Sequence, residues 1–218
     1  AFAGGIYTES ECAADGQKLC DAWVRILSAR GVNWCMGQPV QSFVVRGQQT
    51  MAVQLVSGQD IPADAFVLST GHSAPVLAAQ VGIRLSVYPL KGYSITVDTN
   101  GPSLAPRVSI TDSARKIVFA RLGRRLRAAG MVELVGQDAR IQSRQIQILQ
   151  QATQALFPDC SRYTDIQPWA GMRPATPTGL PIIGHQGGPR NLFINAGQGA
   201  LGFTLAFGSA VQLANALG

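Results

Sequence analysis

Two segments near the C-terminus carry residue types that can bind an organic anion. The first, residues 169–184 (WAGMRPATPTGLPIIG), holds a single charged side chain, Arg173, among prolines, glycines and apolar residues. A guanidinium is a planar, permanently charged fork that binds a carboxylate through two parallel hydrogen bonds. Prolines after Arg173 would stiffen its loop, and Trp169 could form a pocket wall. The pattern favours a carboxylate anchor, and a surface arginine covered by its own loop is the alternative.

The second segment is a glycine-rich turn, GQGALG (residues 197–202), which joins an expected strand to an expected helix. Glycines allow backbone N–H groups to approach a ligand closely, and a helix N-terminus attracts negative charge. Gly197, Gly199 and Gly202 match the G-x-G-x-x-G spacing of dinucleotide-binding proteins. That fingerprint also needs a following βαβ unit and an acidic residue about 20 positions later, which residues 203–218 do not supply. Two interpretations remain: a tightly packed turn, or amides that face an electron-rich ring such as a flavin.

The other candidate side chains give little support to acid–base, nucleophilic or metal chemistry. The histidines are isolated, G-x-S-x-G is absent, and no carboxylate pair is typical of a glycosidase. The cysteines form no C-x-x-C pair and have no histidine at ligand spacing, which favours reduced cysteines in an intracellular protein and no metal site. Tyr88 and Tyr93 have opposite parity on an expected strand, and Lys91 shares the parity of Tyr93. Glu133 is the one acid expected to be buried, paired with a neighbouring arginine.

The composition indicates a folded chain with an excess of positive charge. The 218 residues are 46% hydrophobic and 14% charged, which allows a sizeable core and disfavours disorder. A net charge of +6 permits an anionic partner. The one dense basic cluster, residues 121–127, is more typical of a solvated strand or turn than of a nucleic-acid site, so no nucleic-acid partner is expected. No uninterrupted apolar run reaches the roughly 20 residues that span a bilayer.

Hydrophobic periodicity divides the chain into helical and strand-like segments. A three- to four-residue spacing predicts helices over residues 15–32 and 140–158, the second stopped by Pro158, and a final helix follows the glycine turn. Alternating or short apolar runs predict strands within residues 40–46, 50–56, 61–71, 84–99, 107–123, 125–136 and 191–197. The order predicts a mixed α/β (α+β) fold. A small α/β layer comes from both ends of the chain, and an antiparallel sheet with a helix fills the middle.

Several of these segments together resemble a known family. VYPLKGYSIT, RAAGMVELVG, WAGMRPATPTGLPIIG and NLFINAGQGALGFTLAFGS occur in the order of the C-terminal half of the D-amino-acid dehydrogenases, flavoproteins of the D-amino-acid oxidase superfamily. ADAFVLSTGHSAPVLA is similar to that family's strand entering the FAD site. The resemblance implies a partial FAD-binding layer (1–83), an antiparallel substrate-binding domain with one long helix (84–168), and a flavin-facing loop, strand and helix returning to the FAD layer (169–218). The family's N-terminal Rossmann fingerprint would precede Ala1.

The resemblance also implies an activity and the residues that serve it. Such proteins use FAD to oxidise a D-amino acid, D-alanine-like in this expectation, to a 2-oxo acid and ammonia by hydride transfer to the flavin. Arg173 and Tyr93 would be catalytic, and both would bind substrate together with Trp169. The positions expected at the cofactor are Val40, Thr70, Gly71, Gly197, Gln198, Gly199, Ala200, Leu201, Gly202 and Thr204. Electrons would pass to a quinone or another acceptor, and the protein would be cytoplasmic or peripheral on the inner face of the plasma membrane.

Two positions depart from the family's pattern. Gln198 stands where the family usually has the histidine of Gly-His-Gly, and an amide cannot carry positive charge beside the flavin. Thr178 replaces the usual aspartate of T-P-D-G, a change expected to alter only a turn. Because the Rossmann fingerprint is not among these residues, we expect the isolated chain to bind FAD weakly or not at all and to be inactive. An inactive fragment or diverged relative that binds only small carboxylates or a partner subunit is the alternative.

Overall fold

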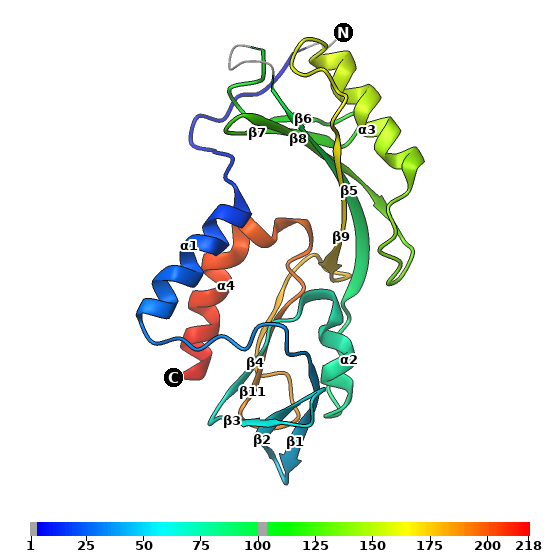
Figure 1. Cartoon of the computed structure of the whole chain (residues 1–218). Coiled ribbons are helices and arrows are strands. Elements are labelled where there is room, and N and C mark those ends of the chain that lie inside the picture. Colours follow the sequence, from blue (N-terminus) through cyan, green and yellow to red (C-terminus); the bar gives the residue numbers. More distant parts are fainter. Residues whose placement is uncertain (1–3, 100–103) are drawn as a thin grey trace. The chain divides into compact units, whose positions relative to one another are not determined.

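The structure, a computed structural model, describes residues 4–99 and 104–218. The chain forms two compact units, and each unit draws on segments that lie far apart in the sequence (Figure 1). Unit 1 consists of Ala1–Trp23, Gly92–Val132 and Ala139–Gly171, and unit 2 consists of Val24–Lys91, Glu133–Asp138 and Met172–Gly218. The three consecutive regions expected from the sequence stay a prediction, because these units group residues by spatial contact and not by order along the chain.

Within the described residues, unit 1 is built on a five-stranded sheet with the order β6-β7-β8-β5-β9. Its strands are β5 (Tyr88–Asp98), β6 (Ile110–Asp112), β7 (Ile117–Leu122), β8 (Arg125–Glu133) and β9 (Gln167–Ala175). β7 pairs antiparallel with both β6 and β8. The basic cluster at residues 121–127 forms the turn between β7 and β8, as the sequence predicted. β5 and β9 continue beyond unit 1 into unit 2.

The core of unit 1 lies between the sheet and helix α3 (Ser143–Leu156), which runs along one face of the sheet (Figure 1). Tyr93 and Ile95 of β5 and Leu126 of β8 are buried in one cluster with Leu149 of α3. Side chains alternate across a strand, so the residues between these core positions project from the opposite face of the sheet. The expected helix over residues 140–158 is thus confirmed, with ends two or three residues further in.

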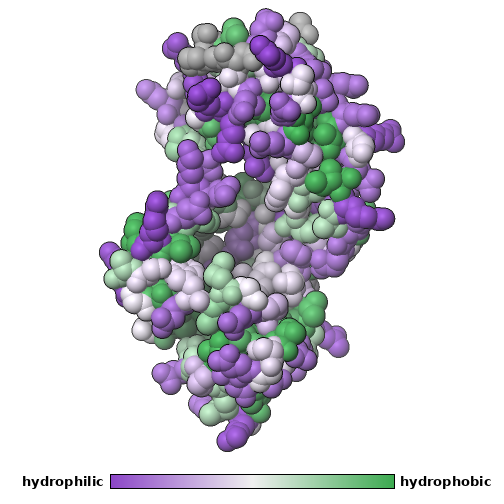
Figure 2. Space-filling view, viewed as in Figure 1, coloured by the Kyte–Doolittle hydropathy of each residue, from purple (hydrophilic) through white to green (hydrophobic). Residues whose placement is uncertain are grey.

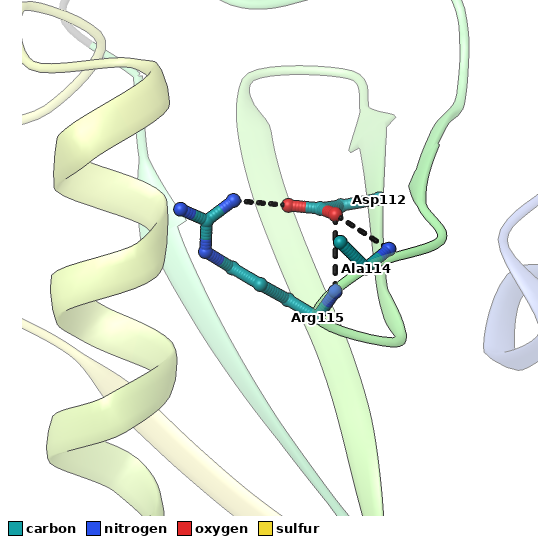
Figure 3. Close-up of polar contacts among 3 residues, drawn as sticks. All are labelled: Asp112, Ala114 and Arg115. Carbon is teal, nitrogen blue, oxygen red and sulfur yellow. Dashed lines mark hydrogen bonds and ion pairs between the residues drawn. The ribbon is translucent and has the colours of Figure 1, made fainter. Parts of the chain in front are cut away.

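Asp112 organises the turn that joins β6 to β7 (Figure 3). Its Oδ1 accepts hydrogen bonds from the backbone N–H groups of Ala114 (3.0 Å) and Arg115 (3.1 Å). Its Oδ2 accepts a hydrogen bond from the Arg115 guanidinium at 2.7 Å. The hydrogen bond from the Arg115 side chain, followed by that from its backbone, favours the charged carboxylate and holds the pKa of Asp112 below its ordinary value of 3.8. Residues 107–123 therefore hold two strands and an aspartate-centred turn.

We expect Asp112→Asn to destabilise the protein near neutral pH and to remove one component of its acid sensitivity. The pKa of Asp112 is lower in the folded chain than in the unfolded chain, so its stabilisation is complete above about pH 4 and is lost as the pH falls through the folded-state pKa. Urea unfolding at about pH 6 and about pH 3 measures the difference between variant and parent. The exposed neighbour Ser113 supplies a control, because Ser113→Ala should change neither value. An equal loss at both pH values would contradict the role of the carboxylate charge.

Within the described residues, unit 2 holds two three-stranded sheets. The first has the order β1-β2-β3, with β1 (Val40–Arg46), β2 (Gln49–Leu55) and β3 (Asp60–Pro62) paired antiparallel. The second has the order β10-β11-β4, with β4 (Phe66–Leu68), β10 (Ile182–Gly184) and β11 (Leu192–Ala196). β11 is antiparallel to β10 and parallel to β4. The parallel pair places the carboxyl ends of two strands at one edge of this sheet.

Asn191 joins the two sheets of unit 2. Its Oδ1 accepts a hydrogen bond from the N–H of Thr50 at 2.9 Å, and its Nδ2 donates to the carbonyls of Thr50 (2.8 Å) and Asp64 (2.9 Å). The core beside it combines strand and helix residues: Phe66, Leu68, Leu192 and Ile194 with Ala74 and Ala78 of α2 (Ala74–Ala79). The side-chain amide of Asn191 thus fixes the start of β11, which positions the turn at the other end of that strand.

Two segments differ from the sequence prediction, and proline is involved in both. Residues 61–71, expected as one buried strand, form the end of β3, then β4, and then η1 (Gly71–Ser73). Pro62 lacks the N–H that a strand needs for pairing, so β3 ends there. The segment around Arg173, expected as a loop, is strand β9 as far as Ala175. β9 is the edge strand of its sheet, so the N–H groups that Pro168 and Pro174 lack are not needed for pairing between central strands.

Helix α4 (Gly202–Leu217) carries an exposed apolar stripe. Phe203, Phe207 and Val211 are exposed and recur every four residues, which places them on one side of the helix. The same helix packs against β10 and β11, where Ser209 is buried. The stretch Gly199–Leu217 is long and apolar enough to cross a membrane, by length and composition only. Figure 2 shows hydrophobic residues on the surface of unit 2, to which α4 belongs.

Candidate functional site

The parallel strands β4 and β11 end together at one edge of their sheet. Leu68 pairs with Ile194, so the segments that follow the two strands leave the sheet side by side. The first of these segments contains Thr70 and Gly71, and the second is the glycine turn that begins at Gly197. Ligands of sheets with parallel strands bind outside the carboxyl ends of the strands. The edge formed by β4 and β11 is therefore where a ligand of unit 2 is expected.

Two glycines shape the turn after β11 for different reasons. Gly197 has a φ of +88°, and an added Cβ would lie 2.6 Å from Cγ2 of Thr176, so both the backbone and a close neighbour exclude a side chain. Gly199 has a φ of +57°, but an added Cβ would meet nothing within 4 Å. Gly197 is thus a packing position, whereas Gly199 leaves open space at the start of η2 (Gly199–Leu201), which leads into α4. The tightly packed interpretation of the turn therefore holds at Gly197, whereas the flavin-facing interpretation stays a prediction.

Gln198 is fixed inside the turn by its own hydrogen bonds. Its Nε2 donates to Oδ1 of Asn195 at 2.6 Å, and its carbonyl accepts the N–H of Leu201 at 3.1 Å. An amide is uncharged, and one N–H of this amide is already used within the protein. Gln198 therefore shapes the turn. Asn195 is a residue that the sequence reasoning missed, and its place at the end of β11 was the available signal.

The end of β9 brings a third segment to this edge. Ala175 forms an antiparallel bridge with Gln198, and a Cβ on Gly71 would lie 3.9 Å from Cγ of Pro174. Pro174 and Ala175 therefore border both turns, and Arg173 directly precedes them. Arg173 is half-buried, and this burial lowers the pKa of its guanidinium because desolvation disfavours the charged form. Arg173 thus lies two positions before Ala175, the residue that bridges to the glycine turn, in a partly dry environment.

The loop after β9 is organised by two threonines. Thr176 Oγ1 donates a hydrogen bond to the carbonyl of Leu180 at 2.8 Å, and Thr178 Oγ1 accepts the N–H of Leu180 at 3.3 Å. Gly179, with a φ of +74°, lies between Thr178 and Leu180. Thr178 therefore stabilises this turn through its side-chain oxygen, at the position where an aspartate was expected from the family resemblance.

The remaining positions expected at the cofactor lie in three elements of unit 2. Ala200 and Leu201 are in η2, and Gly202 and Thr204 are in the first turn of α4. The first N–H groups of a helix have no partner inside the helix, and the helix dipole adds partial positive charge there, which suits an electron-rich group. Val40 begins β1 in the other sheet and pairs with Leu55. A contact between Val40 and the cofactor stays a prediction.

Tyr93 and Trp169 belong to unit 1. Tyr93 is 1% exposed and lies in the core cluster on the α3 side of β5, which speaks against direct contact with a ligand. Trp169 is 53% exposed, and Cζ of Arg127 lies 5.2 Å from the centre of its ring. The substrate roles of both aromatic residues stay predictions.

Glu133 forms an ion pair that the sequence did not predict. Its Oε2 lies 3.4 Å from Nζ of Lys91, and the expected pairing with an arginine stays a prediction. The side chain of Lys91 is 1% exposed, and a buried ammonium requires a carboxylate because an uncompensated buried charge is costly. Met131, with a φ of +67°, departs from strand geometry shortly before Glu133, which shifts the alternation of β8.

Among residues 4–99 and 104–218, no group of three or more potential metal ligands occurs.

Comparison with known protein families identifies the family to which this chain belongs. Residues 1–216 match the family DAO, FAD-dependent oxidoreductases. The chain belongs to this family. D-amino acid dehydrogenase 2 of Pseudomonas aeruginosa is 44% identical over 218 residues, 100% of this chain and 52% of the relative. D-amino acid dehydrogenase 2 of Ralstonia nicotianae is 43% identical over 224 residues, 99% of this chain and 52% of the relative. The chain spans about half the length of these curated relatives.

Solved structures show the same fold. An iminodiacetate oxidase from Chelativorans sp. BNC1 superposes with a TM-score of 0.81 and 24% identity, covering 93% of this chain and 55% of the oxidase. A glycine oxidase from Geobacillus kaustophilus gives a TM-score of 0.72 and 25% identity, covering 83% of this chain and 48% of that structure. The predicted fold class, the C-terminal half of an FAD-dependent oxidoreductase with antiparallel sheets, is confirmed.

The edge formed by β4 and β11 fits the FAD on which the DAO family depends. Gly199 leaves room where any other residue would place a Cβ, and this room lies beside the N-terminus of α4. Gly71, with a φ of +58°, keeps the neighbouring turn free of a side chain next to Pro174. The residues that would hold the flavin are therefore Thr70, Gly71 and the segment 197–204.

Proposed function

We propose that the protein containing this chain is an FAD-dependent D-amino acid dehydrogenase that converts D-alanine-like amino acids to 2-oxo acids and ammonia. The observation that carries the proposal is the meeting, within unit 2, of the turn after β4, the glycine turn after β11 and the end of β9 that bears Arg173. The names and identities of the Pseudomonas and Ralstonia relatives support the substrate class.

In this proposal the chemistry that bound FAD would supply is acceptance of a hydride from the α-carbon of the amino acid. Arg173 holds the substrate carboxylate through two parallel hydrogen bonds, and its half-buried position strengthens this ion pair relative to one in water. With the carboxylate fixed, the α-hydrogen is held in one orientation. No protein base is required when the amine binds in its neutral form, because the amine then has no proton to lose before hydride transfer. Water then hydrolyses the imino acid to the 2-oxo acid and ammonia.

The electron acceptor and the location belong to the same proposal. A quinone or another carrier would receive the electrons, at the inner face of the plasma membrane or in the cytoplasm. The exposed stripe of Phe203, Phe207 and Val211 on α4 supports contact with an apolar surface, supplied either by lipid or by a further protein segment or subunit.

Flavin reduction without oxygen tests the proposal. The FAD-loaded protein containing this chain is mixed with D-alanine or L-alanine, and the visible absorbance of the flavin is followed. D-alanine should bleach the flavin and release pyruvate and ammonia in equal amounts, and L-alanine should not. If D-alanine binds but leaves the flavin oxidised, the protein is a diverged relative that only binds carboxylates.

A further inference from the structure

A second cluster of charged side chains lies in unit 1, on the face of the sheet opposite α3. It comprises Arg125 and Arg127 of β8, Asp15 next to α1 (Gly16–Ala29), and Trp169 of β9. Leu126, between the two arginines, is buried in the core with α3, so the arginines project from the other face. The proposed oxidation of amino acids assigns no role to these arginines.

The carboxylate of Asp15 is already used by other groups. Its Oδ1 accepts the N–H of Lys18 at 3.4 Å near the start of α1, and its Oδ2 lies 3.3 Å from the Arg125 guanidinium. The Asp15 side chain is 17% exposed, which leaves little room for further partners. Two guanidinium groups thus share one carboxylate, and the cluster keeps one positive charge that no neighbouring acid of the cluster balances.

Arg127 carries that unbalanced charge. Its Cζ lies 5.2 Å from the centre of the Trp169 ring, and within the described residues its guanidinium makes no hydrogen bond or ion pair. Burial lowers the pKa of Arg127, and the nearby Asp15 carboxylate offsets only part of this effect. A guanidinium that lies on an aromatic ring by its flat face keeps its N–H edge free for an acceptor.

The strand between β8 and β9 adds a hydroxyl on the same face. Ser94 of β5 alternates with the core residues Tyr93 and Ile95, so it projects away from α3. Ser94 is 1% exposed, and its Oγ has no hydrogen-bond partner among the described residues. A buried hydroxyl without a partner is destabilising, and a ligand or a water molecule on this face would satisfy it.

We propose that Arg127, supported by Trp169, forms a binding site in unit 1 for the carboxylate of a small organic acid. The carboxylate lies in the plane of the guanidinium and accepts two hydrogen bonds, and its negative charge balances the excess charge of the cluster. All residues of this site belong to unit 1, whereas Arg173 belongs to unit 2.

NMR titration of the protein with acetate tests this site. Acetate should shift the Arg127 Nε–H and Trp169 indole N–H signals saturably, whereas uncharged acetamide should not. Arg127→Met keeps the apolar part of the side chain and should weaken acetate binding about tenfold or more, since it removes two charge-assisted hydrogen bonds. Arg124→Ala, which removes an exposed arginine of the same hairpin, should change the affinity less than about twofold.

Several results would overturn the proposal. Equal shifts with chloride and acetate would indicate general screening of positive charge. Acetate binding that survives Arg127→Met would exclude the site. Trp169→Ala provides a second variant, because this exposed side chain can be removed without opening the core, and it should weaken acetate binding while the protein stays folded. Arg173→Ala should leave the response intact, and its loss in that variant would assign the binding to Arg173.

Discussion

Arg173→Ala is expected to lower kcat/KM for the D-amino acid by about 10²- to 10⁴-fold. The variant loses two hydrogen bonds between charged groups, each worth about 1.5–3 kcal/mol, and every 1.4 kcal/mol corresponds to about a factor of ten. Arg173 is half-buried and lies next to Pro174 and Ala175, which border the glycine turn, so a substituted side chain leaves the carboxylate without a fixed position. Steady-state turnover of the FAD-loaded protein with an artificial electron acceptor measures the effect.

A second variant separates charge from geometry at Arg173, and a third serves as a control. Arg173→Lys keeps the positive charge but not the planar fork, so its kcat/KM should fall between those of the parent and Arg173→Ala. Arg190→Ala is the matched control, because Arg190 is an exposed arginine of unit 2 and its backbone N–H, which the substitution keeps, donates a hydrogen bond to the carbonyl of Gln48. FAD content should be the same in every variant. If Arg173→Ala keeps kcat/KM within about threefold of the parent, Arg173 is not the carboxylate anchor.

Elements with strong local signals were predicted well from the sequence. Helix α3 begins within three residues of the expected start and ends before Pro158, because both its periodicity and its stop are local properties. Strand β1 has the expected bounds, residues 40–46, since its turn at Gly47 is equally local. The basic segment 121–127 was also correctly interpreted as strand and turn.

Elements whose formation depends on their place in a sheet were not predictable in the same way. β9 contains Pro168 and Pro174, which a sequence pattern assigns to a loop, and only its edge position makes these prolines acceptable. The ion pair between Lys91 and Glu133 was missed for a related reason. The two residues lie on different strands and far apart in the sequence, so their contact depends on how the sheet forms.

The candidate site shows the same division between local and non-local information. The glycine turn and the unusual placement of Arg173 were visible in the sequence, and the resemblance supplied their chemical meaning. The bridge between Ala175 and Gln198, and the approach of Pro174 to Gly71, are contacts between distant segments. The fold is therefore needed to show that these residues share one edge of a sheet.

Gly197→Ala is expected to lower the free energy of unfolding by about 2–4 kcal/mol. A non-glycine residue at a φ of +88° is strained, and the added methyl would lie 2.6 Å from Cγ2 of Thr176. Rotation of the Thr176 side chain gives little relief, because its Oγ1 is hydrogen-bonded to the carbonyl of Leu180 at 2.8 Å. Urea unfolding of the variant and the parent measures the loss.

Gly199→Ala is the matched control in the same turn, and it separates packing from cofactor binding. Its φ of +57° lies in the left-handed region, and the new methyl meets no neighbour within 4 Å, so the loss of stability should be about 1–2 kcal/mol, the cost of the backbone conformation alone. If the open side of Gly199 faces the flavin, this methyl should still weaken FAD binding, which titration with FAD measures in the protein containing this chain. A smaller loss of stability than in Gly197→Ala, combined with weakened FAD binding, would place the flavin at this turn. Unchanged FAD binding in Gly199→Ala would leave the turn with a packing role alone, because Gly197 already accounts for its tight contacts.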